Sequence, residues 1–349
     1  RSDFIDEEGR GYKNCFLVSS FPCIITRMSK LRVAVLRGGP SSEYDVSLKT
    51  GASVLKHLDR ERYQPLDVFI DKDASWHVDG VLANPLDLRH HADVAWNALH
   101  GTYGEDGEIQ RILESAGVPY TGSGVVASAV AMHKTKAKDV FVRHGLSVAP
   151  GIEVELSVIN DADIRDIFRT LPPPYVVKPV SGGSSVGMSI AHSIGELHDA
   201  LMRAGEQSSN ILIESMIRGR EATCGIVDGF RGEKYYALMP IEIIPPPKAS
   251  FFDYDAKYSG ETQEICPGRF SREETAAIQD AARIAHEGLG ARHYSRSDFI
   301  VTPKGKIYIL ETNTLPGLTE ESLVPKALTA AGCSLKDFLD HVIGQVTRG

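Results

Sequence analysis

Short apolar runs alternate with segments of helical periodicity along most of the chain, a pattern typical of α/β proteins. Strands are predicted at residues 31–36, 66–70 and 94–99, and a helix follows the first of them up to about residue 58. Strands joined in this way usually pair in parallel, so this part of the chain is predicted to form a small parallel sheet. The residue pattern changes near Tyr120, and we place a domain boundary there.

Further along the chain the same pattern predicts a helix that carries Lys134, a buried strand that ends with Lys178, and a strand at 210–214. An amphipathic helix is predicted at 272–290 and a closing helix at 334–346.

The densest polar pattern lies in residues 296–323, where two apolar runs flank T-P-K-G and predict a β-hairpin. Side chains alternate along a strand, so Arg296 shares a face with Asp298, and Glu311 shares a face with Asn313. A two-residue turn would place Asp298 opposite Glu311 and Arg296 opposite Asn313. A four-residue loop would keep all four on one face, shifted diagonally, and a three-residue loop with a bulge would separate them.

These oxygen donors, beside a cation on an otherwise apolar strand, are typical of a Mg2+ site that handles phosphate. The structural alternative is a solvated outer face of an edge hairpin.

Polar loops follow several of the predicted strands. The loop R-G-G-P-S-S-E-Y-D-V-S-L lies between the first strand and its helix, a ready site for anions, but it lacks the G-x-G-x-x-G of dinucleotide-binding proteins. His100 follows the third strand, where open α/β sheets bind ligands, although a lone histidine there is more often structural.

Lys178 precedes V-S-G-G-S-S-V-G, which is not a P-loop but offers N–H groups and hydroxyls to phosphate; a flexible hairpin loop is the alternative. Glu214 and Glu221 follow the strand at 210–214 and could accept hydrogen bonds from a nucleoside, or could be solvated surface. The long segment 243–268 is Pro-rich and then polar, which favours a lid or binding loop.

Bulk composition narrows the functional classes. The chain has 349 residues, a net charge of −8 and no basic stripe, so nucleic acid is not expected as a partner. No apolar run is long enough to span a bilayer, and five cysteines without C-x-x-C spacing favour reduced thiols in the cytoplasm. Residues 1–29 are a poor signal peptide and are expected to lie outside the fold, as upstream sequence before a start at Met28.

In order and spacing, the motifs from about Leu31 to Val346 resemble the D-alanine–D-alanine ligases of the ATP-grasp superfamily. The segments that carry the resemblance are G-G-P-S-S-E-Y-D-V-S-L, H-G-T-Y-G-E-D-G, Y-T-G-S-G, V-K-P-V-S-G-G-S-S-V-G-M-S, L-I-E-S-M-I-R-G-R-E, D-Y-D-A-K-Y, R-S-D-F and L-E-T-N-T-L-P-G-L-T-E-E-S-L-V-P. The resemblance implies an α/β, three-domain ATP-grasp fold with an N-terminal Rossmann-like (preATP-grasp) parallel sheet. The expected parts are an extension (1–29), an N-terminal substrate domain (30–122), a central subdomain (123–214) and a C-terminal subdomain with the lid loop and the Mg2+ site (215–349).

The resemblance also implies roles for individual residues. ATP would be bound by Lys134 and Lys178 on its phosphates, by Glu214, Glu221 and the backbone of Met216 and Ile217 on its adenosine, and by Lys257 of the lid. Many relatives have Trp where Met216 stands, which implies altered packing at the base. Two Mg2+ ions, with Mn2+ as a substitute, would be held by Asp298, Glu311 and Asn313.

The implied reaction joins two D-alanine molecules through an acyl phosphate, for peptidoglycan precursors. Its catalytic residues would be Arg296 and Gly317, at the oxyanion-stabilising positions, and the triad Glu43, Ser184 and Tyr258; the substrate-binding residues would be Glu43, His100, Ser322 and Leu323. Tyr258 favours D-alanine over D-lactate as second substrate.

The rival interpretations are a related ligase that uses D-lactate or D-serine, a non-catalytic nucleotide-binding module, and a dinucleotide-dependent dehydrogenase. The resemblance further implies a cytoplasmic homodimer with no nucleic-acid partner and no stable membrane association.

Overall fold

The computed structural model describes residues 30–183, 186–246 and 262–348. The chain divides into two compact units, Arg1–Lys30 and Leu31–Gly349, and the features below belong to the second unit. The predictions for residues 1–29 and for Ser184, Lys257 and Tyr258 lie outside the described residues.

The first sheet contains the three predicted parallel strands. Strand β1 (Leu31–Gly38) pairs in parallel with β2 (Tyr63–Ile70) and with β5 (Val94–Asn97), and α1 (Tyr44–His57) connects β1 to β2. A short antiparallel extension that the sequence pattern did not reveal, β3 (Trp76–Val78) and β4 (Val81–Ala83), completes the order β4-β3-β2-β1-β5. The remaining helices of this region are η1 (Pro85–Asp87), α2 (Leu88–His91) and α3 (Glu108–Ala116).

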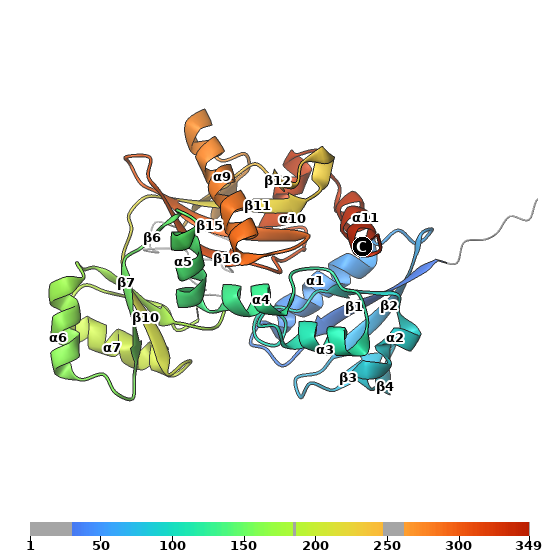
Figure 1. Cartoon of the computed structure of the whole chain (residues 1–349), viewed down its shortest axis with the longest axis horizontal. Helices are drawn as coiled ribbons and strands as arrows, with labels where there is room; N and C mark the ends of the chain where they lie inside the picture. Colours follow the sequence, from blue (N-terminus) through green and yellow to red (C-terminus); the bar gives the residue numbers. More distant parts are fainter. Residues whose placement is uncertain (1–29, 184–185, 247–261, 349) are drawn as a thin grey trace, which may run out of the picture. The chain divides into compact units, whose positions relative to one another are not determined.

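The second sheet is antiparallel, in the order β7-β10-β8-β9. Its strands are β7 (Gly151–Glu155), β8 (Tyr175–Pro179), β9 (Ser189–Ala191) and β10 (Asn210–Ser215). Helices α6 (Asp161–Thr170) and α7 (Ile194–Gly205) lie beside this sheet (Figure 1) and bury their apolar stripes in a common core with it. The buried strand that ends near Lys178 is thus β8, as the sequence indicated.

The third sheet has the order β14-β13-β11-β15-β16-β6, with β12 beside β11. Its strands are β6 (Ser147–Val148), β11 (Arg220–Asp228), β12 (Tyr235–Ala237), β13 (Ile241–Ile244), β14 (Gln263–Ile265), β15 (Tyr294–Val301) and β16 (Ile307–Asn313); a 3-10 turn, η2 (Phe230–Gly232), follows β11. Helix α9 (Arg272–Leu289) crosses this sheet, as Figure 1 shows, and a capping box between Ser271 and Glu274 fixes its first turn. The small side chains of Ala281, Ala282 and Ala285 are buried in the core between α9 and the sheet.

The helix predicted around Lys134 is two helices, α4 (Val125–Met132) and α5 (Lys134–Arg143). The break falls at His133, whose extended backbone (φ −93°, ψ 99°) ends α4 and whose ring accepts a hydrogen bond from the N–H of Lys136 as the cap of α5. No Gly or Pro marks this break, so the apolar pattern gave no sign of it. Lys134 therefore stands at the start of a helix and not within one.

The hairpin of β15 and β16 pairs Asp298 with Glu311 and Arg296 with Asn313. Its turn is a three-residue loop between Thr302 and Lys306, and the expectation that such a loop would separate the four residues is wrong. A second irregularity lies between Asp298 and Phe299, where Leu310 is the extra residue on β16. The bulge at Leu310 shifts the pairing by one residue and so restores the opposition that a two-residue turn would have given.

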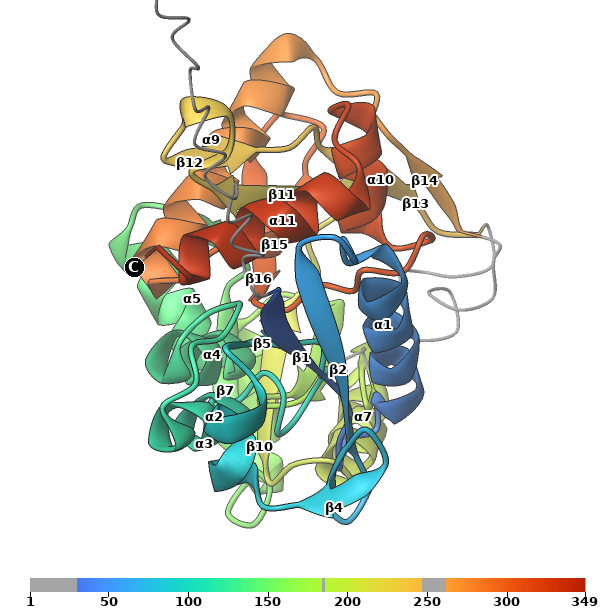
Figure 2. The ribbon, with the colours of Figure 1, turned by 90° about the vertical axis from the view of Figure 1, so that its right-hand side faces the viewer.

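One core joins the first sheet to the C-terminal helices α10 (Leu323–Ala330) and α11 (Leu335–Val346). The ring of Trp96 from β5 stacks on Tyr294 from β15 at 6.1 Å between centroids, and Phe338 of α11 lies 5.3 Å from the Tyr294 ring. Figure 2 shows α11 beside α1. Strands at the start of the chain thus depend on its last helix for cover.

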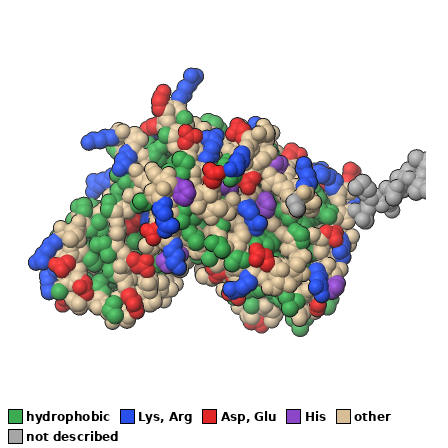
Figure 3. Space-filling model, in the orientation of Figure 1, with side chains coloured by type: hydrophobic (Ala, Val, Ile, Leu, Met, Phe, Trp, Pro, Cys, Tyr) green, Lys and Arg blue, Asp and Glu red, His purple; other side chains and the backbone are tan. Residues whose placement is uncertain are grey.

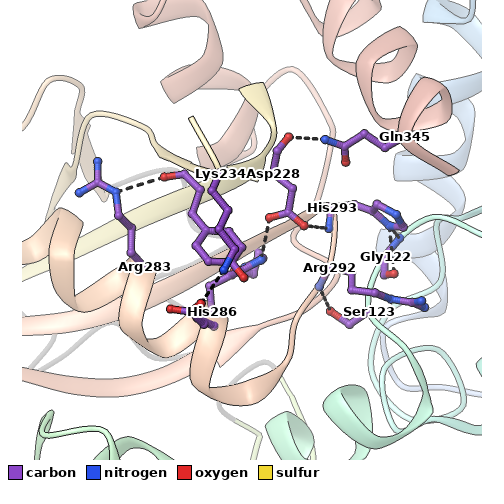
Figure 4. Close-up of polar contacts among 12 residues, drawn as sticks. Gly122, Ser123, Asp228, Lys234, Arg283, His286, Arg292, His293 and Gln345 are labelled. Carbon is purple, nitrogen blue, oxygen red and sulfur yellow. Dashed lines mark hydrogen bonds and ion pairs between the residues drawn. The ribbon is translucent and has the colours of Figure 1, made fainter. Parts of the chain in front are cut away.

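A polar cluster outside this core ties β11, α9 and β15 to the segment at Gly122 (Figure 4). His286 Nε2 lies 2.8 Å from Asp228 Oδ1, and His286 Nδ1 lies 2.7 Å from Ser295 Oγ. His293 donates its backbone N–H to Asp228, and its Nδ1 lies 3.0 Å from the Gly122 N. The Asp–His–Ser order resembles a hydrolytic triad, but His286 and Ser295 are only 0% and 1% exposed, so no substrate reaches them and the cluster is structural.

The described part of the chain contains no helix that is both long and apolar enough to cross a membrane. On the face drawn in Figure 3, Lys and Arg side chains are interspersed with Asp and Glu side chains.

Candidate active site

A cavity of about 780 Å³ is lined by strands of the second and third sheets, by α1, and by the loops that follow β1 and β5 of the first sheet. Every site residue named from the sequence that lies in the described part of the chain is on its wall. These residues are Glu43, His100, Lys134, Lys178, Glu214, Met216, Ile217, Glu221, Arg296, Asp298, Glu311, Asn313, Gly317, Ser322 and Leu323. Residues far apart in the sequence therefore share one space.

Lys134 anchors the glycine-rich loop that follows β8. Its backbone N–H donates to Val180 O at 2.9 Å, and its Nζ donates to Gly182 O at 2.7 Å. Lys134 is also the first residue of α5, so its backbone lies at the positive end of a helix dipole. This corner of the cavity is suited to an anion.

Glu214, at the end of β10, is paired with two lysines. Lys178 Nζ lies 2.6 Å from Glu214 Oε2, and Lys138 Nζ lies 2.5 Å from Glu214 Oε1. Burial alone would raise the pKa of Glu214, but Lys178 and Lys138 together hold it below its ordinary value. Sequence reasoning missed Lys138, because nothing in its helix distinguishes it from its neighbours Lys134 and Lys136.

The apolar part of the cavity surrounds the strand ends near Met216. Val176, Met188, Ile190 and Leu310 line it. The N–H of Met216 donates to Pro174 O at 2.8 Å, so the backbone group that Met216 can offer a ligand is its carbonyl. Apolar walls with a few fixed polar groups are the usual lining of a site for a planar base.

The hairpin presents Asp298, Glu311 and Asn313 to the cavity. Arg296 clamps Asp298 in a bidentate pair, with Nε 3.0 Å from Oδ1 and Nη2 2.9 Å from Oδ2. The hydroxyl of Thr223 on β11 also donates to Asp298, at 2.6 Å.

These donors fit a magnesium ion by their chemistry. Within the described ranges, no group of three or more His, Cys, Asp or Glu side chains is arranged to hold a metal. Two carboxylates and an amide oxygen on paired strands are hard ligands, and Mg2+ usually completes its shell with water and phosphate oxygens. The pairing at the hairpin therefore suits an ion that is bound together with a phosphate.

His100 and Glu105 lie at the end of β5, deep in the cavity wall. His100 Nε2 is 2.8 Å from Thr50 Oγ1, and burial lowers the pKa of His100 to about 4, so its ring is neutral at pH 7. Glu105, which the sequence did not single out, accepts hydrogen bonds from the N–H groups of Gly101 and Leu315. Burial, followed by repulsion from Glu43, raises the pKa of Glu105 to about 8.

The Glu43 carboxylate lies between two glycines. A Cβ at Gly101 would fall 2.8 Å from Glu43 Oε2, and a Cβ at Gly183 would fall 2.5 Å from the same atom. A side chain at either position would displace the Glu43 carboxylate, so the loop that leads to residue 184 approaches Glu43 closely.

Ser322 occupies the N-cap position of α10 at another edge of the cavity, and its hydroxyl bonds to Thr319 and not to the helix. Its Oγ lies 2.8 Å from Thr319 Oγ1 and accepts a hydrogen bond from the N–H of Thr319 at 3.1 Å. Gly317 is so close to Ser322 Oγ that a Cβ would lie 3.0 Å from it. A helix N-terminus beside a hydroxyl is a suitable place for a carboxylate.

Comparison with known proteins agrees with this geometry. The family model "D-ala D-ala ligase N-terminus" matches residues 32–89 and 80–123. The family model "D-ala D-ala ligase C-terminus" matches residues 140–344. The chain is 42% identical over 315 residues to the D-alanine–D-alanine ligase of Syntrophobacter fumaroxidans, covering 90% of this chain and 97% of the relative.

Two solved structures are also similar. The VanG D-Ala:D-Ser ligase from Enterococcus faecalis matches with a TM-score of 0.81 at 28% identity, covering 91% of this chain and 99% of that one. The D-alanine–D-alanine ligase from Bacillus anthracis, solved in complex with ATP, matches with a TM-score of 0.74 at 31% identity, covering 91% and 97%. The described part of the chain has the ATP-grasp fold of these enzymes, with parallel strands in its N-terminal sheet, as the resemblance implied. On the sequence matches, which cover nine-tenths of its length, the chain belongs to the D-alanine–D-alanine ligase family.

Proposed function

We propose that this chain joins two D-alanine molecules to D-alanyl-D-alanine at the expense of ATP, through an acyl phosphate. The observation that carries the proposal is the single cavity, which holds cations for phosphate, hard oxygens for a metal ion and donors for an oxyanion. Membership of the family supports the choice of substrates.

The nucleotide would lie among the residues that enter the cavity from the second and third sheets. Lys134 and Lys178 bind its phosphates as point charges. The carboxylates of Glu214 and Glu221 and the backbone of Met216 and Ile217 bind the adenosine. Lys257, which lies outside the described residues, is proposed to reach the phosphates from the lid loop.

Asp298, Glu311 and Asn313 would hold two Mg2+ ions, for which Mn2+ can substitute. When bound, the ions offset the charge of the phosphates as an anionic nucleophile approaches. Arg296 contributes its own positive charge beside them and orients Asp298 through the bidentate pair.

The first D-alanine would be held by Glu43 through its ammonium group, with His100 near its carboxylate. Because His100 is neutral at pH 7, it can donate or accept a hydrogen bond without adding charge. The carboxylate attacks the γ-phosphorus of ATP, which forms the acyl phosphate and releases ADP.

The second D-alanine would be held through its carboxylate by Ser322 and Leu323 at the start of α10. Its amine attacks the acyl carbon to give a tetrahedral oxyanion, which collapses with release of phosphate. Arg296 and the N–H of Gly317 stabilise the oxyanion, and loss of one such donor typically costs about 100-fold or more in rate.

The proposed function and its alternative differ in the second substrate, the acceptor. The alternative is a related ligase that uses D-lactate or D-serine in place of the second D-alanine. The solved structure with the TM-score of 0.81 is a D-Ala:D-Ser ligase, and this similarity is the reason to consider D-serine as the acceptor. We propose D-alanine, with Glu43, Ser184 and Tyr258 as a hydrogen-bonded triad that ties the lid to the first sheet. Ser184 and Tyr258 lie outside the described residues, and the close approach of Gly183 to Glu43 supports the triad.

We further propose that the chain acts in the cytoplasm as a homodimer, that it supplies peptidoglycan precursors, and that it has no nucleic-acid partner and no stable membrane association. Its substrates, D-alanine and ATP, are small and soluble, and the net charge of −8 and the absence of a basic stripe in the sequence support the proposal that it has no nucleic-acid partner.

Phosphate release by the purified chain with ATP and Mg2+ tests the proposal. D-alanine alone should stimulate release. Addition of D-lactate or D-serine to limiting D-alanine should yield little mixed product by mass spectrometry. Predominant D-alanyl-D-serine or D-alanyl-D-lactate would favour the alternative, and no release with any D-amino acid would refute the ligase.

A further inference from the structure

Lys138 lies beneath the cavity and has no part in the proposed reaction. Its side chain projects from α5 one helical turn after Lys134, and the residue is 6% exposed. Its ammonium group lies 2.5 Å from Glu214 Oε1, while Lys178 takes the other oxygen of that carboxylate at 2.6 Å. Lys178 lines the cavity and Lys138 does not, so Glu214 has one lysine on the cavity side and one behind it.

The three side chains form a buried group of two cations and one anion. The side chains of Lys138, Lys178 and Glu214 are 8%, 10% and 3% exposed. Burial lowers the pKa of Lys138, and attraction to Glu214 opposes this. At Lys178 attraction to Glu214 and Glu311 outweighs burial, and the pKa of Lys178 is raised. Burial of a second ammonium group, that of Lys138, costs desolvation energy, so a buried lysine at this position needs a compensating role.

Binding of a nucleotide changes what Lys178 must do. In the structure its ammonium group is 2.6 Å from Glu214, whereas a phosphate oxygen in the cavity would compete for the same ammonium group. Without another cation, movement of Lys178 onto phosphate would leave Glu214 as a buried, unpaired charge, which is strongly unfavourable. Lys138 does not line the cavity and is paired with the other oxygen of Glu214, so it is placed to remain on Glu214 when Lys178 moves.

We propose that Lys138 is a positioning residue for nucleotide binding, which keeps Glu214 paired so that Lys178 can exchange Glu214 for a phosphate oxygen. Glu214 then has a cationic partner both before and after the nucleotide binds, and it keeps its place for the adenosine. The inference rests on the proposed function in that it requires a nucleotide in this cavity. It goes beyond that function by assigning part of the nucleotide affinity to a residue that does not touch the nucleotide.

The variant Lys138→Met removes the charge and keeps the length of the side chain. We expect its KM for ATP and its Kd for a non-hydrolysable ATP analogue with Mg2+ to rise by about tenfold or more. The KM for D-alanine and the kcat at saturating ATP should stay within about twofold of wild type. Lys138 contacts neither the residues proposed to bind D-alanine nor the reacting atoms. Lys138→Arg, which restores a cation, should bring the analogue affinity back to within about threefold.

Lys136→Met is the matched control, since Lys136 is an exposed lysine on the same helix. It removes the same charge at a short distance and should leave both constants unchanged. An analogue affinity of Lys138→Met within twofold of wild type would overturn the proposal, and so would an equal loss in Lys136→Met. A fall in kcat together with a rise in the KM for D-alanine as well as for ATP would indicate a merely structural role and would also overturn it.

A crystal structure of the unaltered chain with the ATP analogue and Mg2+ gives a second test that does not depend on a variant that folds. Lys178 should lie on a phosphate oxygen while Lys138 remains within hydrogen-bonding distance of Glu214. Lys178 still paired with Glu214, or Lys138 displaced from it, would contradict the exchange. If the chain binds the analogue but releases no phosphate with D-alanine, the proposed function fails, while the affinities of the variants still decide the role of Lys138.

Discussion

Three carboxyl groups around the cavity have different kinds of partner. Glu214 has two ammonium groups, Glu105 has two backbone N–H groups, and Asp298 has a guanidinium group. Because a partly or fully buried charge is costly without such partners, each pair fixes the position of its carboxylate. At the scale of the residue, the polar and charged groups of the site are already oriented before any substrate binds.

Asp298→Asn should abolish Mg2+-dependent turnover and leave the protein folded. The amide carries no charge for the metal ion and cannot accept both bonds from Arg296, so we expect a loss of about 100-fold or more in kcat/KM. Phosphate release at several Mg2+ concentrations measures the loss, and thermal unfolding checks the fold.

Asp280→Asn is the control for Asp298→Asn, because Asp280 lies on α9 and pairs with Arg283 away from the cavity. It should keep wild-type activity. Near-normal turnover of Asp298→Asn would remove Asp298 from the proposed metal site.

His293 should make stability depend on pH in acid. Burial, with repulsion from Arg292, lowers the pKa of His293 from 6.5 to about 4. Between pH 6.5 and pH 4 His293 is protonated in the unfolded chain but not in the folded chain. The contribution of His293 to the free energy of unfolding is therefore present above pH 6.5 and is lost as the pH falls toward 4. The physical cause is the burial of the ring, together with the positive charge of Arg292; attraction to Asp228 and the hydrogen bond with Gly122 offset this lowering only in part.

Urea unfolding of the wild type and of His293→Asn between about pH 7 and pH 4 measures this contribution. Asn tolerates the positive φ of 68° at this position, so the variant should fold. The stability difference between the two proteins should shrink by about 2 kcal/mol over that range, and a constant difference would refute the assignment. His198→Asn, at an exposed position of α7, should show the same acid dependence as the wild type.

At the scale of the element, the β15–β16 hairpin determines which oxygen donors face each other. Two irregularities act together there, a turn with Gly305 in the left-handed region (φ 76°) and the bulge at Leu310. The bulge lies between the turn and the pair Asp298–Glu311. Strain in the turn should therefore affect stability without moving the donors.

Gly305→Ala should reduce the free energy of unfolding by about 1 kcal/mol, because a Cβ is unfavourable at this φ. No atom lies within 4 Å of the new methyl group, so no clash adds to the conformational cost. Denaturant unfolding gives the change, and kcat/KM of the folded enzyme should equal that of the wild type.

Gly305→Asn is the matched control, since Asn adopts the left-handed region at lower cost and should lose less stability than Ala. A drop in kcat/KM in parallel with stability would show that the turn, and not the bulge, sets the register of the donors.

The sequence was most informative where an element has strong periodicity or a marked end. It predicted β1, α1, β2, β5, α9 and α11, because their apolar patterns and caps are local signals. It missed the break at His133 and the bulge at Leu310, because both depend on neighbours that are distant in the chain. The short strands β3 and β4 carry too few residues to show a period.

The candidate site was predictable where a motif carries it, and not elsewhere. Family motifs led to residues that line one cavity. Lys138 gave no signal, and Glu105 was given no role although it lies in the motif H-G-T-Y-G-E-D-G, because the importance of both lies in contacts with Glu214 and Leu315 across the fold. The domain boundaries at 122/123 and 214/215 stay predictions, as do the roles of Ser184, Lys257 and Tyr258.

At the scale of the whole molecule, the chain divides into the unit Arg1–Lys30 and the unit that contains the cavity. Deletion of residues 1–27 should therefore leave kcat/KM and the melting temperature unchanged, because the described site residues all belong to the second unit. Phosphate release and calorimetry of the truncated chain test this. Loss of solubility or of activity would show that the removed segment belongs to the fold.

The core around Trp96 has a consequence for synthesis on the ribosome. The face of β1 and β5 that Trp96 belongs to is covered by Phe338, Leu339 and Val342 of α11. At ordinary elongation rates, the nascent chain exposes this apolar face for roughly 10 to 50 s before α11 has been translated. We therefore expect the first sheet to need a holding chaperone during translation, and a fragment that stops short of α11 to aggregate.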